Sequence, residues 1–158
     1  KEEYETNEKT FGSVTKTGES KLDIELKRNI FPVEVGTDLG KILGVSIIYF
    51  DLDKWNIRPD AAEDLEKIIA VMNQYPNMTI DIRSHTDSRQ THKYNELLSD
   101  RRAKSTLEFM VKNGINRNRL TAKGYGETQL VNNCSDDVPC SEAEHQKNRR
   151  SEFIVLKM

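Results

Sequence analysis

The sequence has few cysteines, few prolines and no long apolar run. Its 158 residues include two cysteines and four prolines. No stretch of about 18 apolar residues occurs, so a transmembrane helix is not expected. A basic surplus is also lacking: the formal net charge is -2, which argues against general nucleic-acid binding, since that requires a positive surface. The apolar residues, 35% of the chain, gather in periodic segments, which is typical of a folded domain.

The two cysteines, Cys134 and Cys140, lie close together in a polar segment. Because no third cysteine or paired histidine completes a zinc set, a disulfide is the favoured interpretation and two free thiols are the alternative. A disulfide across so short a loop would stabilise the fold by about 2 kcal/mol on the loop-entropy model. It would also indicate an oxidising compartment such as the periplasm.

Residues 1–42 differ in pattern from the rest and are predicted to be an N-terminal extension. Leu22, Ile24 and Leu26 alternate with charged residues, which predicts one half-buried strand. A lone strand is not stable by itself. We therefore expect either the end of a preceding β-module plus a linker, or a tail that packs on the main domain. The chain begins at Lys1 and not at Met, so we expect a piece of a longer protein, with any signal peptide or lipid anchor outside it.

Residues 43–158 are predicted to form the main domain, in which strand and helix patterns alternate. The expected strands lie at 45–50, 78–83, 120–126 and 153–156. Helices are expected from Pro59 to about 75 and from about 94 to 113, with a short helical piece at 142–147. The second helix is expected to bury Leu97, Ala103, Leu107, Met110 and Val111. The order β-α-β-α-β-β predicts an α/β (α+β) two-layer sandwich, with a mixed sheet and helices on one face.

The polar stretch after the second predicted strand, Ser84-His85-Thr86-Asp87, is where a site is expected, because loops at strand ends commonly carry function. Asn95 and Arg102 are seven residues apart and share a face of the next helix. That helix can bring Arg102 and Asp87 over one groove. The pair suits a zwitterionic amino acid, since a guanidinium binds a carboxylate through two hydrogen bonds and an aspartate binds the ammonium. The alternative is an Asp87–Arg102 salt bridge that only orders the loop.

Several motifs occur in a fixed order along the chain. They are Tyr49-Phe50-Asp51-x-Asp53, His85-Thr86-Asp87, Tyr94-Asn95-x-x-Leu98-Ser99-x-x-Arg102-Ala103, Gly124-Tyr125-Gly126-Glu127 and Asn148-Arg149-Arg150. From about residue 45 to the end, the chain resembles the C-terminal peptidoglycan-binding domain of the OmpA, Pal and MotB family. The cysteine-bearing insert resembles the Bacteroidetes members in particular.

This resemblance implies a protein of the periplasm, associated with the outer membrane, that binds peptidoglycan non-covalently. It implies that Asp87 and Arg102 contact diaminopimelate in the stem peptide. The same resemblance implies that the groove is lined by Phe50, Asp51, Thr86, Asn95, Leu98 and Arg149. Two departures are Ser84 and Gln90, which stand where the family often has glycine; at Gln90 a positive φ would be costly. Whether the chain forms oligomers is left open.

Other chemistries are less well supported by the sequence. His85, Asp87 and His92 are suitable zinc ligands, but three such residues in a polar loop are common by chance. Asp51 and Asp53 lack the further oxygen ligands that calcium requires. No nucleophile elbow occurs and no activated nucleophile is evident, so we expect no enzyme, metal or cofactor. The alternative from another class is a protein–protein interaction module that uses the same groove.

Overall fold

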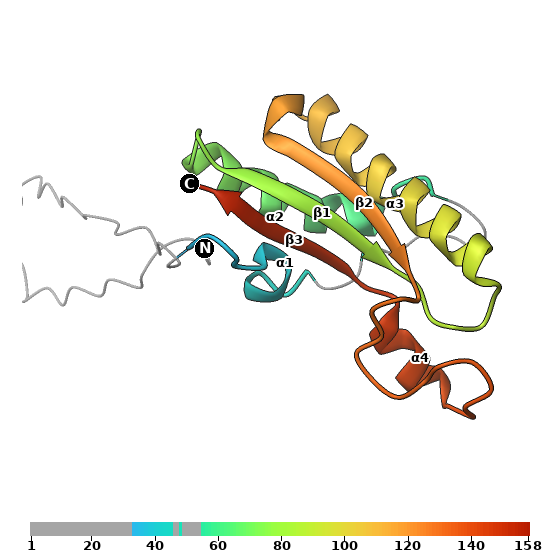
Figure 1. Ribbon diagram of the computed structural model, residues 1–158. Coiled ribbons are helices and arrows are strands. Elements are labelled where there is room, and N and C mark those ends of the chain that lie inside the picture. Colours follow the sequence, from blue (N-terminus) through green and yellow to red (C-terminus); the bar gives the residue numbers. More distant parts are fainter. Residues whose placement is uncertain (1–32, 46–47, 49–54) are drawn as a thin grey trace, which may run out of the picture. The chain divides into compact units, whose positions relative to one another are not determined.

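The computed structural model describes residues 33–45, 48 and 55–158 (Figure 1). The chain divides into two units, residues 1–32 and 33–158, and the second contains all the described residues. The strand predicted around Leu22 to Leu26 lies outside the described residues, as does most of the strand predicted at 45–50. No helix in the described segments combines the length and apolar character that a membrane crossing requires.

The described part of the chain contains a three-stranded mixed sheet. Its strands are β1 (Thr79–His85), β2 (Leu120–Gly126) and β3 (Ser151–Lys157), in the spatial order β2-β1-β3. The central strand β1 runs parallel to β2 and antiparallel to β3. This arrangement confirms the predicted mixed sheet, and the β2 boundaries are those expected from the sequence.

Two long helices supply most of the remaining core. These are α2 (Pro59–Gln74), which passes behind the strands in Figure 1, and α3 (His92–Lys112), which runs alongside β2. Proline suits the first position of α2 because its missing N–H would be unpaired there. Their apolar side chains pack in one core with Ile80, Ile82, Phe153 and Val155, each at most 1% exposed. Two layers with helices on one face are therefore confirmed.

The face that α3 turns toward β2 differs from the prediction. Leu97, expected to be buried, is 49% exposed, whereas Asn95, Ser99 and Thr106 are buried. The reason is helix geometry: Leu97 is two residues, about 200° of rotation, from both Asn95 and Ser99, so it lies on the opposite side of α3. On the buried side the helix backbone approaches the strand closely, since a Cβ on Gly124 would lie 2.1 Å from the amide nitrogen of Asp100. Small or polar side chains fit this contact where leucine would not.

The described unit begins before the predicted boundary at residue 43. Gly36 N donates to Val155 O at 2.8 Å, and Val155 N donates to Thr37 O at 2.9 Å. Asp38 then caps the short helix α1 (Leu39–Ile42) by accepting from Gly40 N. Residues 33–42 therefore pair with the β3 edge of the sheet and belong to the same unit as the rest of the domain.

Two shorter elements complete the described structure. The 3-10 turn η1 (Arg117–Arg119) leads into β2, and the helix α4 (Glu142–Asn148) precedes β3. Figure 1 shows α4 and the loop before it at the end of the sheet where β1 and β2 finish. Four of the predicted site residues, Thr86, Asp87, Asn95 and Arg149, gather at this end.

We expect Gly124→Ala to lower the free energy of unfolding by about 3 kcal/mol, because its Cβ would collide with the α3 backbone, which cannot move without repacking the core. Urea denaturation measures this change. Lys123→Ala, at the exposed neighbouring position, should change it by less than about 0.5 kcal/mol. Equal stability of the two variants would contradict the close contact.

Candidate functional site

Asp87 lies just beyond the end of β1 and is 7% exposed. The preceding residue is fixed to the next strand, since Thr86 N donates to Gly126 O at 2.8 Å. The Asp87 carboxylate accepts hydrogen bonds from Arg89 Nη2 at 2.8 Å and from Arg149 Nη1 at 2.5 Å. Burial by itself raises the pKa of Asp87, but the hydrogen bonds from these two guanidinium groups outweigh it and leave the pKa below its usual value. Asp87 is therefore ionised at neutral pH.

The two arginines share a second acidic partner. Arg89 Nη1 lies 2.7 Å from a Glu142 carboxylate oxygen, and Arg149 Nη2 contacts the other oxygen of the same carboxylate. Arg149 also donates to Gln146. Because Glu142 and Gln146 are both on α4, this short helix holds both guanidinium groups beside Asp87.

Asn95 links the Asp87 loop to the first turn of α3. Its side-chain amide donates to the backbone oxygen of Asp87 at 3.0 Å and also to the Glu127 carboxylate. Asn95 is 2% exposed, so the amide is a buried connector between the β1 loop, α3 and the end of β2. Four of the predicted site residues, Thr86, Asp87, Asn95 and Arg149, are therefore together.

Leu98 and Arg102 lie further along α3, and both are half-buried. Seven residues of helix place Arg102 about 10 Å beyond Asn95 on the same side, and helical side chains lean back toward the N-terminus. Arg102 is itself engaged in a side-chain or backbone interaction. Within the described chain, the Asp87 carboxylate pairs with Arg89 and Arg149, so a simple Asp87–Arg102 salt bridge is not the arrangement found. Phe50 and Asp51 lie outside the described residues.

Two important residues were not singled out in the sequence, Arg89 and Glu142. The Asp-x-Arg spacing of Asp87 and Arg89 was the available signal, since a short loop can fold an arginine onto such a carboxylate. Glu142 gave no signal, because its position depends on how α4 packs against a loop 53 residues away from it in sequence.

His85 contributes to the neighbouring structure and not to a metal set. Its ring stacks on Tyr125 with 5.4 Å between centroids, and its Nε2 lies 3.5 Å from a Glu152 oxygen. The described residues form no metal-binding group from His85, Asp87 and His92. Burial, followed by repulsion from Arg150, lowers the pKa of His85 to about 4.

Gln90 stands where the family often has glycine, and a positive φ would have strained its backbone. Its φ is not positive in the structure, so this strain does not arise.

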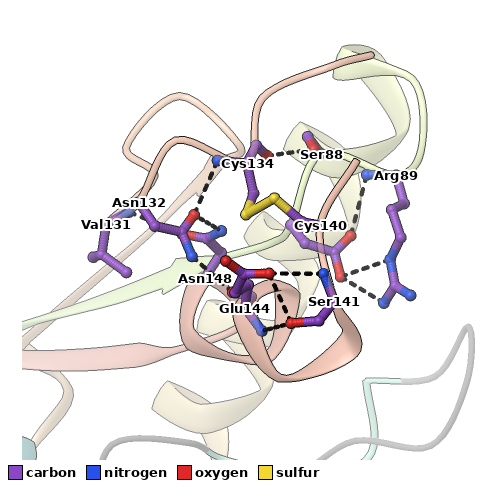
Figure 2. Close-up of a disulfide and its surroundings, with 10 residues drawn as sticks. Ser88, Arg89, Val131, Asn132, Cys134, Cys140, Ser141, Glu144 and Asn148 are labelled. Atoms are coloured by element: carbon purple, nitrogen blue, oxygen red, sulfur yellow. Dashed lines mark hydrogen bonds and ion pairs between the residues drawn. A yellow bond between two sulfur atoms is a disulfide. The ribbon is translucent and has the colours of Figure 1, made fainter. Parts of the chain in front are cut away.

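A disulfide between Cys134 and Cys140 closes the loop before α4, which confirms the favoured interpretation (Figure 2). Ser88 Oγ donates to the backbone oxygen of Cys134 at 2.7 Å, and this joins the loop to the segment that carries Asp87. Ser141 and Glu144 form a capping box at the start of α4. The disulfide therefore closes the segment that leads into the helix carrying Glu142.

A sequence model of the OmpA family matches residues 49–144. The chain belongs to the OmpA family. This match confirms the resemblance stated from the motifs; the Bacteroidetes subtype stays a prediction.

Curated relatives of this OmpA-family chain align with 68% of it. The peptidoglycan-associated lipoprotein of Agrobacterium fabrum is 36% identical over 108 residues, which are 58% of that protein. The outer membrane porin F of Pseudomonas fluorescens is 37% identical over 108 residues, 32% of its length. A photosystem I P700 chlorophyll a apoprotein A2 of Gloeobacter violaceus is 39% identical over 109 residues, only 12% of its length. The chain thus spans less than two thirds of each of these relatives.

Solved structures show that the OmpA-family fold is shared. The peptidoglycan-associated lipoprotein of Burkholderia pseudomallei matches with a TM-score of 0.59 at 24% identity, covering 68% of this chain and 87% of that one. The C-terminal domain of Helicobacter pylori MotB matches with a TM-score of 0.61 at 23% identity, covering 72% of this chain and 84% of that one.

We expect the double substitution Cys134→Ser with Cys140→Ser to lower the free energy of unfolding by about 2 kcal/mol, because the unfolded chain loses a constraint. Urea denaturation with and without reductant provides the control: reductant should destabilise the wild type by a similar amount and leave the variant unchanged. If full reduction left the free energy of unfolding of the wild type unchanged, the disulfide would not stabilise the fold as expected.

Folding stability is expected to depend on His85 below neutral pH. Its folded pKa of about 4 lies below the ordinary 6.5, so the unfolded chain takes up the proton first. Above pH 6.5 the neutral ring makes its full contribution to the free energy of unfolding. This contribution decreases as the pH falls toward 4. His85→Phe keeps the stacking on Tyr125 without titrating. Between pH 6.5 and 4 the Tm of the wild type should therefore fall further than that of the variant; parallel curves would refute this.

Proposed function

We propose that this chain binds cell-wall peptidoglycan non-covalently through the diaminopimelate of the stem peptide. The observation that carries the proposal is the ionised, largely buried Asp87 carboxylate beside the helix that bears Arg102. The names of relatives, among them peptidoglycan-associated lipoproteins, support the same ligand class.

In the proposed complex, Asp87 binds the ammonium group of the zwitterionic centre and Arg102 binds its carboxylate. An ammonium approaching Asp87 meets two guanidinium groups already in place. The Arg89 side chain is 47% exposed and the Arg149 side chain only 23%. We therefore infer that Arg89 moves aside for the ligand, while Arg149 stays as the permanent counter-ion.

The other predicted residues line the groove in this proposal. Thr86 and Asn95 fix the loop around Asp87, and Leu98 offers an apolar surface on the same helix as Arg102. Phe50 and Asp51 complete the lining as the family resemblance implies. The groove carries out no chemical step; it only binds the ligand.

Attachment to the wall would depend on many weak contacts. Desolvating two charged residues limits the affinity for one stem peptide, and a repeating wall supplies multivalent retention. The parent protein would thereby tether the outer membrane to the wall from the periplasm. The relatives named as a lipoprotein and an outer membrane porin support this location.

The test is cosedimentation of the purified chain with sacculi that have been stripped of protein. Asp87→Asn and Arg102→Ala should each lower the retained fraction at least about tenfold, because each removes one charged contact to the ligand. Asp87→Asn should lower Tm, because it removes the carboxylate shared by Arg89 and Arg149. A wild-type-like circular dichroism spectrum at the assay temperature therefore separates lost binding from lost folding.

Neighbouring residues of the same type supply matched controls. Arg101 is exposed and lies over the Trp55 ring, and Asp100 pairs with Lys104. Arg101→Ala and Asp100→Asn should therefore bind sacculi like the wild type. Normal binding by folded Asp87→Asn or Arg102→Ala would overturn the site. Failure of the wild type to bind stripped sacculi would favour a protein partner, and release of soluble wall fragments would indicate an enzyme.

A further inference from the structure

His92, Glu127 and Asp136 come together from three separate segments. His92 is the first residue of α3, Glu127 follows the end of β2, and Asp136 lies in the loop closed by the disulfide. One possible ligand atom from each residue lies within 4.8 Å of those of the other two. Their sequence spacing resembles no metal motif, so only the fold reveals the group.

The Glu127 carboxylate is the buried member of this group, with a side chain only 4% exposed. One of its oxygens accepts from Asn95. The other, Oε1, accepts no hydrogen bond from the described residues, although His92 Nδ1 is its close neighbour. A buried carboxylate oxygen without a hydrogen bond is costly, and a bound cation removes that cost.

We propose that His92, Glu127 and Asp136 bind a divalent transition-metal ion of the zinc class. Imidazole nitrogen and carboxylate oxygen are both ordinary zinc ligands. Ligand atoms about 2.1 Å from a tetrahedral zinc lie about 3.4 Å from one another. His92 Nε2 is already 3.5 Å from Asp136, whereas Nδ1 lies closer than that spacing to Glu127 Oε1, so the imidazole must rotate to direct one nitrogen at the ion. The His92 and Asp136 side chains are 76% and 51% exposed, so both can change rotamer around the fixed Glu127.

The fourth ligand position would be taken by water. Asp136 lines an open pocket of about 510 Å³ together with Ser88 and Thr91, which leaves room on that side. Calcium and magnesium fit less well, because they require six or more oxygen ligands and rarely accept imidazole. The metal would fasten the disulfide loop to the start of α3, next to Asn95.

A metal-free arrangement competes with this proposal. A protonated His92 would bridge the two carboxylates, with Nδ1 toward Glu127 and Nε2 3.5 Å from Asp136. In that case the three residues form an ion-pair network and show no affinity for zinc. Direct titration therefore separates the two interpretations.

The experiment is calorimetric titration of ZnCl₂ into the whole chain, free of any polyhistidine tag. We expect saturable binding of one ion per chain and a raised Tm in its presence. His92→Ala and Asp136→Asn should each weaken binding about tenfold or more, since each removes one of three protein ligands. Both residues are exposed, so the variants should fold like the wild type.

The control is Asp137→Asn, which removes the same charge from the neighbouring residue. Asp137 has a φ of 61°, a conformation that asparagine also tolerates. This variant should bind zinc like the wild type. Absence of saturable binding by the wild type, wild-type affinity in His92→Ala, or equal loss in Asp137→Asn would each overturn the proposal.

Discussion

The ionised carboxylate of Asp87 is the feature on which the described site depends. Its burial opposes ionisation, and hydrogen bonds from the Arg89 and Arg149 guanidinium groups, together with one from the Arg89 backbone N–H, reverse that preference. Removing one partner of a buried ion pair destabilises a protein more than replacing both partners by apolar residues, because the remaining charge stays buried without a counter-ion. Both arginines are in turn held by Glu142, which reaches the site from α4. The charge at the end of β1 is thus maintained by a segment more than fifty residues downstream.

The position of that charge is set by how closely α3 approaches the sheet. Gly124 leaves no room for a side chain, and the Ser99 hydroxyl accepts a hydrogen bond from Gly126 N at 2.8 Å. This contact fixes the first turns of the helix, where Asn95 binds the Asp87 backbone oxygen. Since a helix is rigid over seven residues, the same contact also fixes how far Arg102 stands from the Asp87 loop.

Much of the fold follows from periodicity, and the exceptions have physical causes. The helix expected from Pro59 to about 75 and the strand expected at 78–83 were predicted correctly, since both bury apolar side chains at regular spacing. Leu97 was misplaced because the periodicity was followed through apolar residues, whereas this part of α3 turns Asn95 and Ser99 toward the glycine backbone of β2 and leaves Leu97 on the opposite side. The partners of Asp87 could not be predicted, because the path of the chain through α4 decides them.

A binding site that already contains counter-ions selects for ligands with two charges. In the proposed complex an isolated amine would have to displace Arg89 from Asp87 and would gain little, since one cation only replaces another. A zwitterionic centre compensates for that exchange by giving its carboxylate to Arg102. An anion alone would reach Arg102 but would be repelled by the ionised Asp87. In the proposed complex, these internal ion pairs would therefore select the ligand as well as order the loop, and they would favour an amino acid over an isolated amine or an isolated carboxylate.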